Sequence, residues 1–149
     1  MKTILLLLLI LFALALLWVR LAPIDGDEWH IDPADTDPPR GTGVRLIGPE
    51  APRFPGMPDG VLGAFADIAL SDPSTRLLDG SLDEGMMTFV ARSRVFGFPD
   101  LVTVKATAEG DRTKLSIISR AKYGRSDTGV NAARVDRWLH EMRLRLGEG

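Results

Sequence analysis

The sequence predicts an α+β protein in which an N-terminal membrane helix and a proline-rich tether precede a two-layer sandwich. Three observations support this class. A long apolar run opens the chain, eight of the ten prolines lie between residues 23 and 58, and two amphipathic helical patterns enclose several alternating strand patterns. We therefore expect three or four antiparallel strands flanked by two helices, with both helices on one sheet face and the other face partly open.

The apolar run of residues 4–22 is interrupted only by Arg20 and has no polar face. At 1.5 Å per residue it spans roughly 28 Å, which is about the thickness of one hydrocarbon core. A cleaved signal peptide has a shorter apolar region and small residues before its cleavage site. Here Arg20 occupies the minus-three position of the best site and Pro23 follows the cut. We therefore assign residues 1–22 to an uncleaved signal-anchor helix, with secretion after cleavage as the alternative.

The flanks of this helix indicate its orientation. The positive-inside rule counts Lys and Arg on the two flanks of the helix. With Lys2 before it and Arg20 at its end, the rule favours neither orientation clearly. The short N-terminal tail favours a cytoplasmic N-terminus and an outer C-terminal domain. In a Gram-negative bacterium the protein would be a single-pass protein of the inner membrane, with its domain in the periplasm.

Residues 23–45 form the predicted linker, which is acidic and rich in proline. The stretch from 25 to 37 carries six carboxylates and no Lys or Arg. We expect an extended tether that reaches roughly 70 Å at about 3.1 Å per residue. His30 within it is predicted to be solvated, because the neighbouring carboxylates follow no metal-ligand spacing. The chain has no Cys, which excludes disulfides and thiolate metal sites, and we predict neither a metal nor a cofactor.

The α+β domain is assigned to residues 46–149, and residues 46–57 are expected to lie on it as an irregular segment. A first helix fits Asp59–Leu70, with Asp59 as its cap and one apolar stripe. Strand patterns follow, together with a hairpin turn at Glu109–Asp111. The strand patterns are centred on Met87–Ala91, Val102–Ala106 and Leu115–Ile117, with a further edge strand at Thr75–Leu78.

A closing helix fits Val130–Leu146 and is amphipathic. Its apolar face carries Val135, Trp138, Leu139, Met142 and Leu146, and its polar face carries Arg134, Arg137, Glu141 and Arg145. Residues 112–145 include nine basic and three acidic residues, which gives this segment a net charge of +6 (9 − 3). The C-terminal part is therefore the candidate surface for an anionic partner.

Two motifs together resemble a known family. They are RSRVFGFPDLVTV, Arg92–Val104, and SRAKYGRSDTGVNAARV, Ser119–Val135. The pair resembles the bacterial and plastid family catalogued as Domain of Unknown Function 1499, over residues 46–146. The matching positions are Phe96, Phe98, Pro99, Asp100, Ser119, Arg120, Gly124, Ser126, Asp127, Gly129, Val130, Asn131 and Arg134. The family tends to repeat Ser-Arg where this chain has Ala121-Lys122. The resemblance implies that the two motifs meet in space, and it supplies no reaction.

The second motif leaves a strand and enters the closing helix, so its basic residues would lie near a helix N-terminus, where the dipole favours an anion. Ser126, Asp127 or Thr128 is expected to cap that helix. The candidate anion-binding residues are Arg120, Lys122, Arg125, Ser126, Asp127, Asn131 and Arg134. Alternatively the motif is structural, with Asp127 paired to Arg120 or Arg134. We expect Arg120 to be structural and Lys122 with Arg125 to face the anion.

The aromatic motif Phe96–Asp100 has two interpretations. We expect Phe96 and Phe98 to fill the core where two strands turn, with Asp100 bonding its own loop. Alternatively the two rings rim a ligand site. Tyr123 is expected to be a partly exposed loop ring.

No known catalytic constellation is present in the sequence. It contains no GxSxG elbow, no P-loop or Rossmann glycine pattern and no HExxH. The favoured function is a membrane-tethered, extracytoplasmic binding or assembly module and not an enzyme. Its partners would be the membrane and an anionic small molecule, a lipid headgroup or a membrane protein, with no nucleic acid expected. The alternatives are a small hydrolase using Asp100 and Asp127, and a structural subunit whose open sheet face docks a membrane protein.

Overall fold

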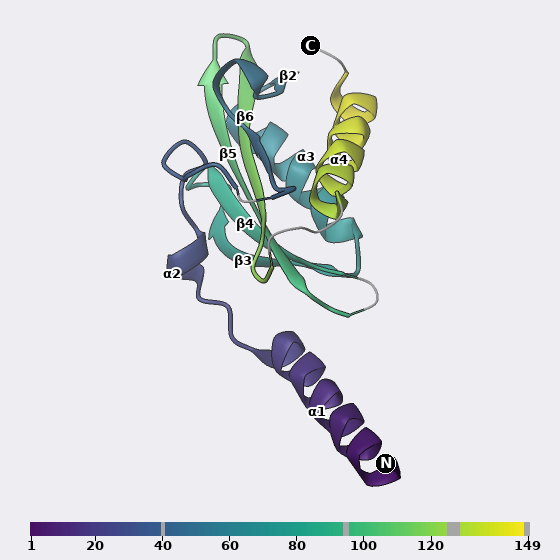
Figure 1. The fold of residues 1–149 in the computed structure, drawn as a ribbon. Helices are drawn as coiled ribbons and strands as arrows, with labels where there is room; N and C mark the ends of the chain where they lie inside the picture. Colours follow the sequence, from purple (N-terminus) through teal and green to yellow (C-terminus); the bar gives the residue numbers. More distant parts are fainter. Residues whose placement is uncertain (40, 94–95, 125–128, 148–149) are drawn as a thin grey trace.

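A computed structural model describes residues 1–39, 41–93, 96–124 and 129–147 of the chain. An N-terminal helix projects from a single mixed domain built of one sheet and two long helices (Figure 1). The elements are α1 (Lys2–Leu21), α2 (Gly26–Trp29), β1 (Val44–Leu46), η1 (Gly48–Glu50), β2 (Arg53–Pro55), α3 (Pro58–Ser71), β3 (Thr75–Ser81), β4 (Met86–Arg92), β5 (Pro99–Glu109), β6 (Arg112–Ala121) and α4 (Val130–Leu146). The α+β class predicted from the sequence is confirmed.

The sheet has six antiparallel strands, in the order β1-β6-β5-β4-β3, and β2 pairs with β6 as well. The prediction of three or four strands was therefore too low. The extra strands, β1 and β2, have three residues each and lie in the segment expected to be irregular. Strands this short show no alternation in the sequence, and the prolines around them hide the pairing. The predicted hairpin joins β5 to β6, with Glu109 paired to Arg112.

Helices α3 and α4 cover one face of the sheet, as expected (Figure 1). The predicted bounds of α4 are confirmed, and α3 extends one residue beyond the prediction at each end. The cap assigned to Asp59 was wrong, because Met57 holds the N-cap position and Pro58 begins the helix. Proline suits the first helical position because its φ angle is already helical and it has no N–H to satisfy.

The core between the helices and the sheet is built around three aromatic rings. Trp138 of α4 is fully buried and meets Phe65 of α3 edge-on, with ring centroids 5.7 Å apart. Phe65 also packs on Phe89 of β4 at 6.2 Å. Edge-to-face and tilted pairs are the favourable geometries for aromatic rings. The apolar stripes predicted for both helices therefore form the core.

The opposite face of the sheet is also covered. Residues 23–39, which we call the strap, cross this outer face and include the short helix α2 (Figure 1). Beneath the strap, the outer-face side chains of Thr88, Thr103 and Ile118 are fully buried. The extended tether and the partly open face expected from the sequence were both wrong. Proline and carboxylate content suggested a solvated linker, but Asp32 pairs with Lys105 on the sheet, and His30 and the Trp29 carbonyl bond threonine hydroxyls.

Helix α1 differs from the two other long helices, α3 and α4, because none of its 20 residues is buried. Its mean hydropathy over 18 residues is 2.9, and Trp18 near its end is exposed. Within the part of the chain that the structure describes, α1 is the one helix long and apolar enough to cross a membrane. This property is compatible with a single-pass anchor.

Candidate functional site

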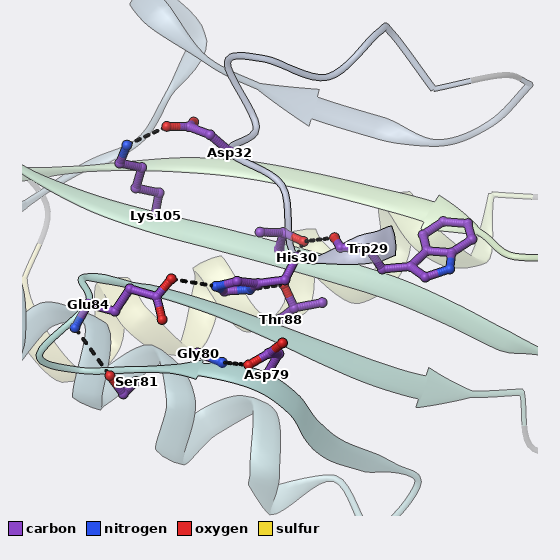
Figure 2. Close-up of polar contacts among 10 residues, drawn as sticks. Trp29, His30, Asp32, Asp79, Gly80, Ser81, Glu84, Thr88 and Lys105 are labelled. Atoms are coloured by element: carbon purple, nitrogen blue, oxygen red, sulfur yellow. Dashed lines mark hydrogen bonds and ion pairs between the residues drawn. The ribbon is translucent and has the colours of Figure 1, made fainter. Parts of the chain in front are cut away.

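His30 fastens the strap to the sheet (Figure 2). Its Nδ1 lies 2.8 Å from Thr88 Oγ1 on β4, and its Nε2 lies 2.8 Å from Glu84 Oε1 in the β3–β4 turn. Only 10% of the His30 side chain is exposed. The prediction of a solvated histidine was wrong, because both ring nitrogens have protein partners. Gly80 permits this approach: its φ is 88°, and a Cβ there would lie 2.6 Å from His30 Cε1.

The direction of the hydrogen bonds follows from the donors available. Thr103 Oγ1 donates to the Trp29 carbonyl at 3.3 Å, which uses its only proton. The Thr88 hydroxyl must then donate to Thr103 Oγ1, 2.9 Å away, so that its oxygen accepts from His30 Nδ1. An ionised Glu84 accepts only from a protonated Nε2. One continuous chain of hydrogen bonds therefore links Glu84, His30, Thr88, Thr103 and the Trp29 carbonyl.

The order carboxylate, imidazole, hydroxyl matches that of a hydrolase triad. Thr88, however, is fully buried beneath the strap, so its hydroxyl has no access to a substrate. Neither of the two grooves described below includes Thr88 in its lining. This arrangement holds the strap in place and does not form a nucleophile.

Further contacts join the strap to other strands. Asp32 forms an ion pair with Lys105 of β5, and Arg45 of β1 donates to the carbonyls of Pro33 and Ala34, each at 3.0 Å. Burial opposes ionisation of Asp32, but the hydrogen bonds from Lys105 and the Ala34 N–H outweigh it and hold its pKa below the ordinary value. Asp32 thus neutralises Lys105, and Arg45 ties the strap to β1 through neutral carbonyls.

A groove of about 480 Å³ lies between the strap and the end of β6, and we call it the strap groove. Arg120 and Lys122, two of the predicted anion-binding residues, line it together. The complete lining is Trp29, Ile31, Asp35, Thr36, Asp37, Pro38, Pro39, Arg120, Ala121, Lys122 and Gly124. The strap therefore supplies one wall, which sequence reasoning missed because it treated this segment as a tether.

Arg120 packs under the strap. Its Nη2 donates to the Trp29 carbonyl at 3.1 Å, and its guanidinium carbon lies 4.8 Å from the centre of the Trp29 ring. Burial lowers the pKa of Arg120, and the charge of Glu28 offsets this in part. Trp29 Nε1 and Arg120 Nε are buried without a hydrogen-bond partner among the described residues. Arg120 therefore holds the strap and leaves positive charge incompletely neutralised beside the groove.

Lys122 lies at the more open side of the groove. Its ammonium donates to the Pro23 carbonyl at 2.9 Å and lies 5.6 Å from the centre of the Tyr123 ring. As expected, Tyr123 is partly exposed. Within the described parts of the chain, neither Lys122 nor Arg120 forms an ion pair with a carboxylate. Both cations therefore line the strap groove with neutral hydrogen-bond partners.

Two other predicted site residues, Asn131 and Arg134, lie on the other side of the sheet. Arg134 Nη2 donates to Asp100 Oδ2 at 3.0 Å, and Arg134 Nη1 donates to Asn131 Oδ1 at 3.1 Å. Ser119 Oγ donates to the same Asn131 oxygen. These four side chains are buried between α4 and the sheet, and we call them the polar cluster. One prediction was wrong here, because Arg134 is buried and does not lie on the exposed face of α4. Asp100, which was expected to bond its own loop, forms an ion pair with Arg134.

The sheet thus divides the predicted site. Ser119 and Arg120 are neighbours on β6, and neighbouring strand residues point to opposite faces. Arg125, Ser126 and Asp127 lie outside the described residues, as does the proposed pairing of Asp127. The N-cap of α4 is Gly129, at φ 85°. No group of three or more His, Asp or Glu side chains suited to a metal occurs in the described part of the chain.

Phe96 and Phe98 are not core residues. Phe96 is 47% exposed and Phe98 38% exposed, and their ring centroids are 6.1 Å apart. The expected core packing was wrong, because both rings are exposed and flank Gly97, which lies against Arg20 at the end of α1. The two rings therefore remain available at the end of the domain nearest α1.

A six-stranded antiparallel sheet with two helices on one face, a strap on the other and an apolar N-terminal helix defines a small α+β domain joined to a candidate membrane anchor. Residues 53–142 match the family described as Protein of unknown function (DUF1499). The chain belongs to this family, as the two sequence motifs indicated. No curated protein matches the chain.

Proposed function

We propose that this protein is a membrane-tethered, extracytoplasmic binding module whose ligand occupies the strap groove. The observation that carries the proposal is the pairing of Arg120 and Lys122 in one groove, without a carboxylate partner for either among the described residues. An anionic group placed between them would offset two positive charges, one of which is already partly desolvated.

The strap wall narrows the class of ligand. It contributes Asp35 and Asp37, both exposed, so the groove carries two acids as well as two bases. These carboxylates would repel a purely anionic ligand and would attract an ammonium group. The best match is a small zwitterion in which a phosphate faces Arg120 and Lys122 while an amine faces the two aspartates. Phosphoethanolamine is the simplest molecule with this chemistry.

The alternative hydrolase draws little support from Asp100. This carboxylate is buried and paired with Arg134, on the opposite side of the sheet from the strap groove. An acid that is both buried and neutralised is poorly placed to activate water. The proposed binding function does not use it.

The binding proposal is tested by melting the full-length protein in neutral detergent at low salt. Phosphoethanolamine should raise the melting temperature more than ethanolamine or glycerol phosphate, because a ligand that binds only the folded state stabilises it. Lys122→Glu should abolish the shift, whereas Lys114→Glu, the same change near the far end of β6, should retain it. The proposal would be overturned if none of the three compounds raised the melting temperature. It would also be overturned if phosphoethanolamine raised the melting temperature of Lys122→Glu as much as that of the wild type.

The tether is tested separately by fractionating cells that express the full chain. The protein should stay in carbonate-washed membranes with Met1 or Lys2 as its N-terminal residue, and added protease should digest the domain only from the outer side. A soluble product beginning near residue 23 would show that the N-terminal segment is a cleaved signal.

A further inference from the structure

A second groove, of about 460 Å³, lies where α1 meets the domain. Three arginines from different elements line it: Arg20 in the last turn of α1, Arg76 on β3 and Arg92 at the end of β4. We call these residues the arginine cluster. None of the described residues that line this groove is acidic. The cluster is therefore a concentration of positive charge with no carboxylate in its own walls.

The three guanidinium groups oppose one another electrostatically. Burial lowers the pKa of Arg92, and the charges of Arg76 and Arg20 lower it further. Arg92 Nη1 donates to the Gly97 carbonyl at 2.9 Å, which is a neutral partner. An arrangement of this kind is unfavourable unless an anion lies close to it. An anion that binds here would come from outside the described groove lining.

The same end of the domain exposes aromatic rings. Phe96 and Phe98 lie in the β4–β5 connection, which is closed by hydrogen bonds from Gly97 N to Ser93 O at 3.0 Å and from Phe98 N to Ser93 Oγ at 3.0 Å. The side chain of Arg20 approaches Gly97 so closely that a Cβ on this glycine would lie 3.5 Å from Arg20 Cγ. The aromatic pair is thus tied to the arginine cluster and to the end of α1.

The position of Arg20 identifies the surface that these groups face. It stands at the end of an apolar helix of 20 residues, where a membrane anchor leaves the hydrocarbon and enters the headgroup layer. Figure 1 shows the β4–β5 connection at the end of the domain nearest this helix. Cationic groups beside exposed aromatic rings are the combination that binds an anionic bilayer surface.

We propose that the arginine cluster binds the phosphate of an anionic lipid in the membrane that holds α1, while Phe96 and Phe98 enter the headgroup layer. This surface differs from the strap groove, and its lipid ligand serves to orient the domain on the bilayer. The inference rests on the membrane anchor of the proposed function. It does not depend on which ligand occupies the strap groove.

The test uses the full-length chain in nanodiscs. Because the chain has no native Cys, Phe96→Cys provides a unique position for a nitroxide label. In discs containing phosphatidylglycerol, the label should be less accessible to a water-soluble nickel complex than in discs of phosphatidylcholine alone. High salt should remove this difference, because ionic screening weakens the attraction.

Matched variants show which surface produces the lipid-dependent difference in label accessibility. Arg76 is exposed, so Arg76→Glu should fold normally and should abolish the lipid-dependent difference. Lys114→Glu, near the far end of the domain, should leave it unchanged. The proposal would be overturned if the label were equally accessible in both lipids. It would also be overturned if Lys122→Glu abolished the lipid-dependent difference while Arg76→Glu retained it. Failure of the chain to enter the discs at all would instead refute the membrane anchor, and the lipid site with it.

Discussion

Arg134 Nη2 lies 3.0 Å from Asp100 Oδ2, and both side chains are more than nine-tenths buried between α4 and the sheet. The pair joins the two sequence motifs of the family, since Asp100 lies in the first motif, near the start of β5, and Arg134 lies in the second. Asn131 and Ser119 extend the same network. The motif residues on this side of the sheet therefore fix α4 to β5 and β6.

Removing one partner of this pair should be costly. Asp100→Ala leaves a buried guanidinium without its carboxylate, and we expect a loss of about 3–5 kcal/mol in the free energy of unfolding. Chemical denaturation of the full-length protein in detergent measures this loss. The double variant Asp100→Leu with Arg134→Met should recover much of the stability, because it leaves no unpaired charge. A loss below about 1 kcal/mol in Asp100→Ala would show that the pair does not hold the fold.

The contact of His30 with the sheet makes the strap sensitive to a single substitution. His30→Ala removes one of the two hydrogen-bond partners of the buried Thr88 hydroxyl, which should cost about 1–3 kcal/mol and loosen the strap. Limited proteolysis should then cut within residues 23–39 before the domain. The control is His140→Ala, since His140 is exposed on α4 and is the other histidine of the chain. If protease cut residues 23–39 at the same rate in both variants, His30 would not be what holds the strap on the sheet.

Acid should also release the strap, through Asp32. Because its pKa is lowered in the folded protein, its ion pair with Lys105 contributes stability above the unfolded pKa and loses it as the pH falls through the folded value. We therefore expect amide exchange in the strap to accelerate below about pH 4. The Asp32→Asn variant should lack this acid-dependent step. An identical acid response in the variant would assign the effect to other groups.

Trp138 tests the core. Its ring is 1% exposed and packs edge-on against Phe65, so Trp138→Ala should lower the free energy of unfolding by about 3–5 kcal/mol. Leu144→Ala on the same helix is the matched control: Leu144 is 75% exposed, and its truncation should cost no more than about 0.5 kcal/mol. Similar losses in the two variants, measured by urea denaturation, would mean that α4 does not pack through this face.

Much of the fold could be predicted from local patterns. The stripe of Val135, Trp138 and Met142 repeats with the helical period, and the alternation in β4, β5 and β6 repeats with the period of a strand. Such periods are visible in any single sequence. The strap has no period, because its contacts to the sheet join residues more than 50 positions apart and depend on individual side chains. Its composition is that of a linker, and only the fold shows what its carboxylates meet.

The candidate site was predicted in part. Charge alone identified Arg120, Lys122 and Arg125 as candidates, with Lys122 and Arg125 as the anion-facing pair. Arg120 and Lys122 line one groove, and Arg125 lies outside the described residues. The assignment of Asn131 and Arg134 to the same site failed because charge says nothing about which sheet face a residue occupies. One signal was present in the sequence: Ser119 and Arg120 are adjacent in a predicted strand and must point to opposite faces. Because strand residues alternate between the two faces, Ser119 and the polar cluster must lie on one face of the sheet, and Arg120 and the strap groove on the other.

The central claim is that the strap and the end of β6 form the two walls of one binding site. Hydrogen exchange of the full-length protein, measured with and without phosphoethanolamine, tests it most directly. The ligand should slow amide exchange both in residues 29–39 and in residues 120–124, and should leave the β5–β6 hairpin near Arg112 unchanged. Protection of only one wall, or protection confined to the arginine cluster of Arg20, Arg76 and Arg92, would contradict the claim.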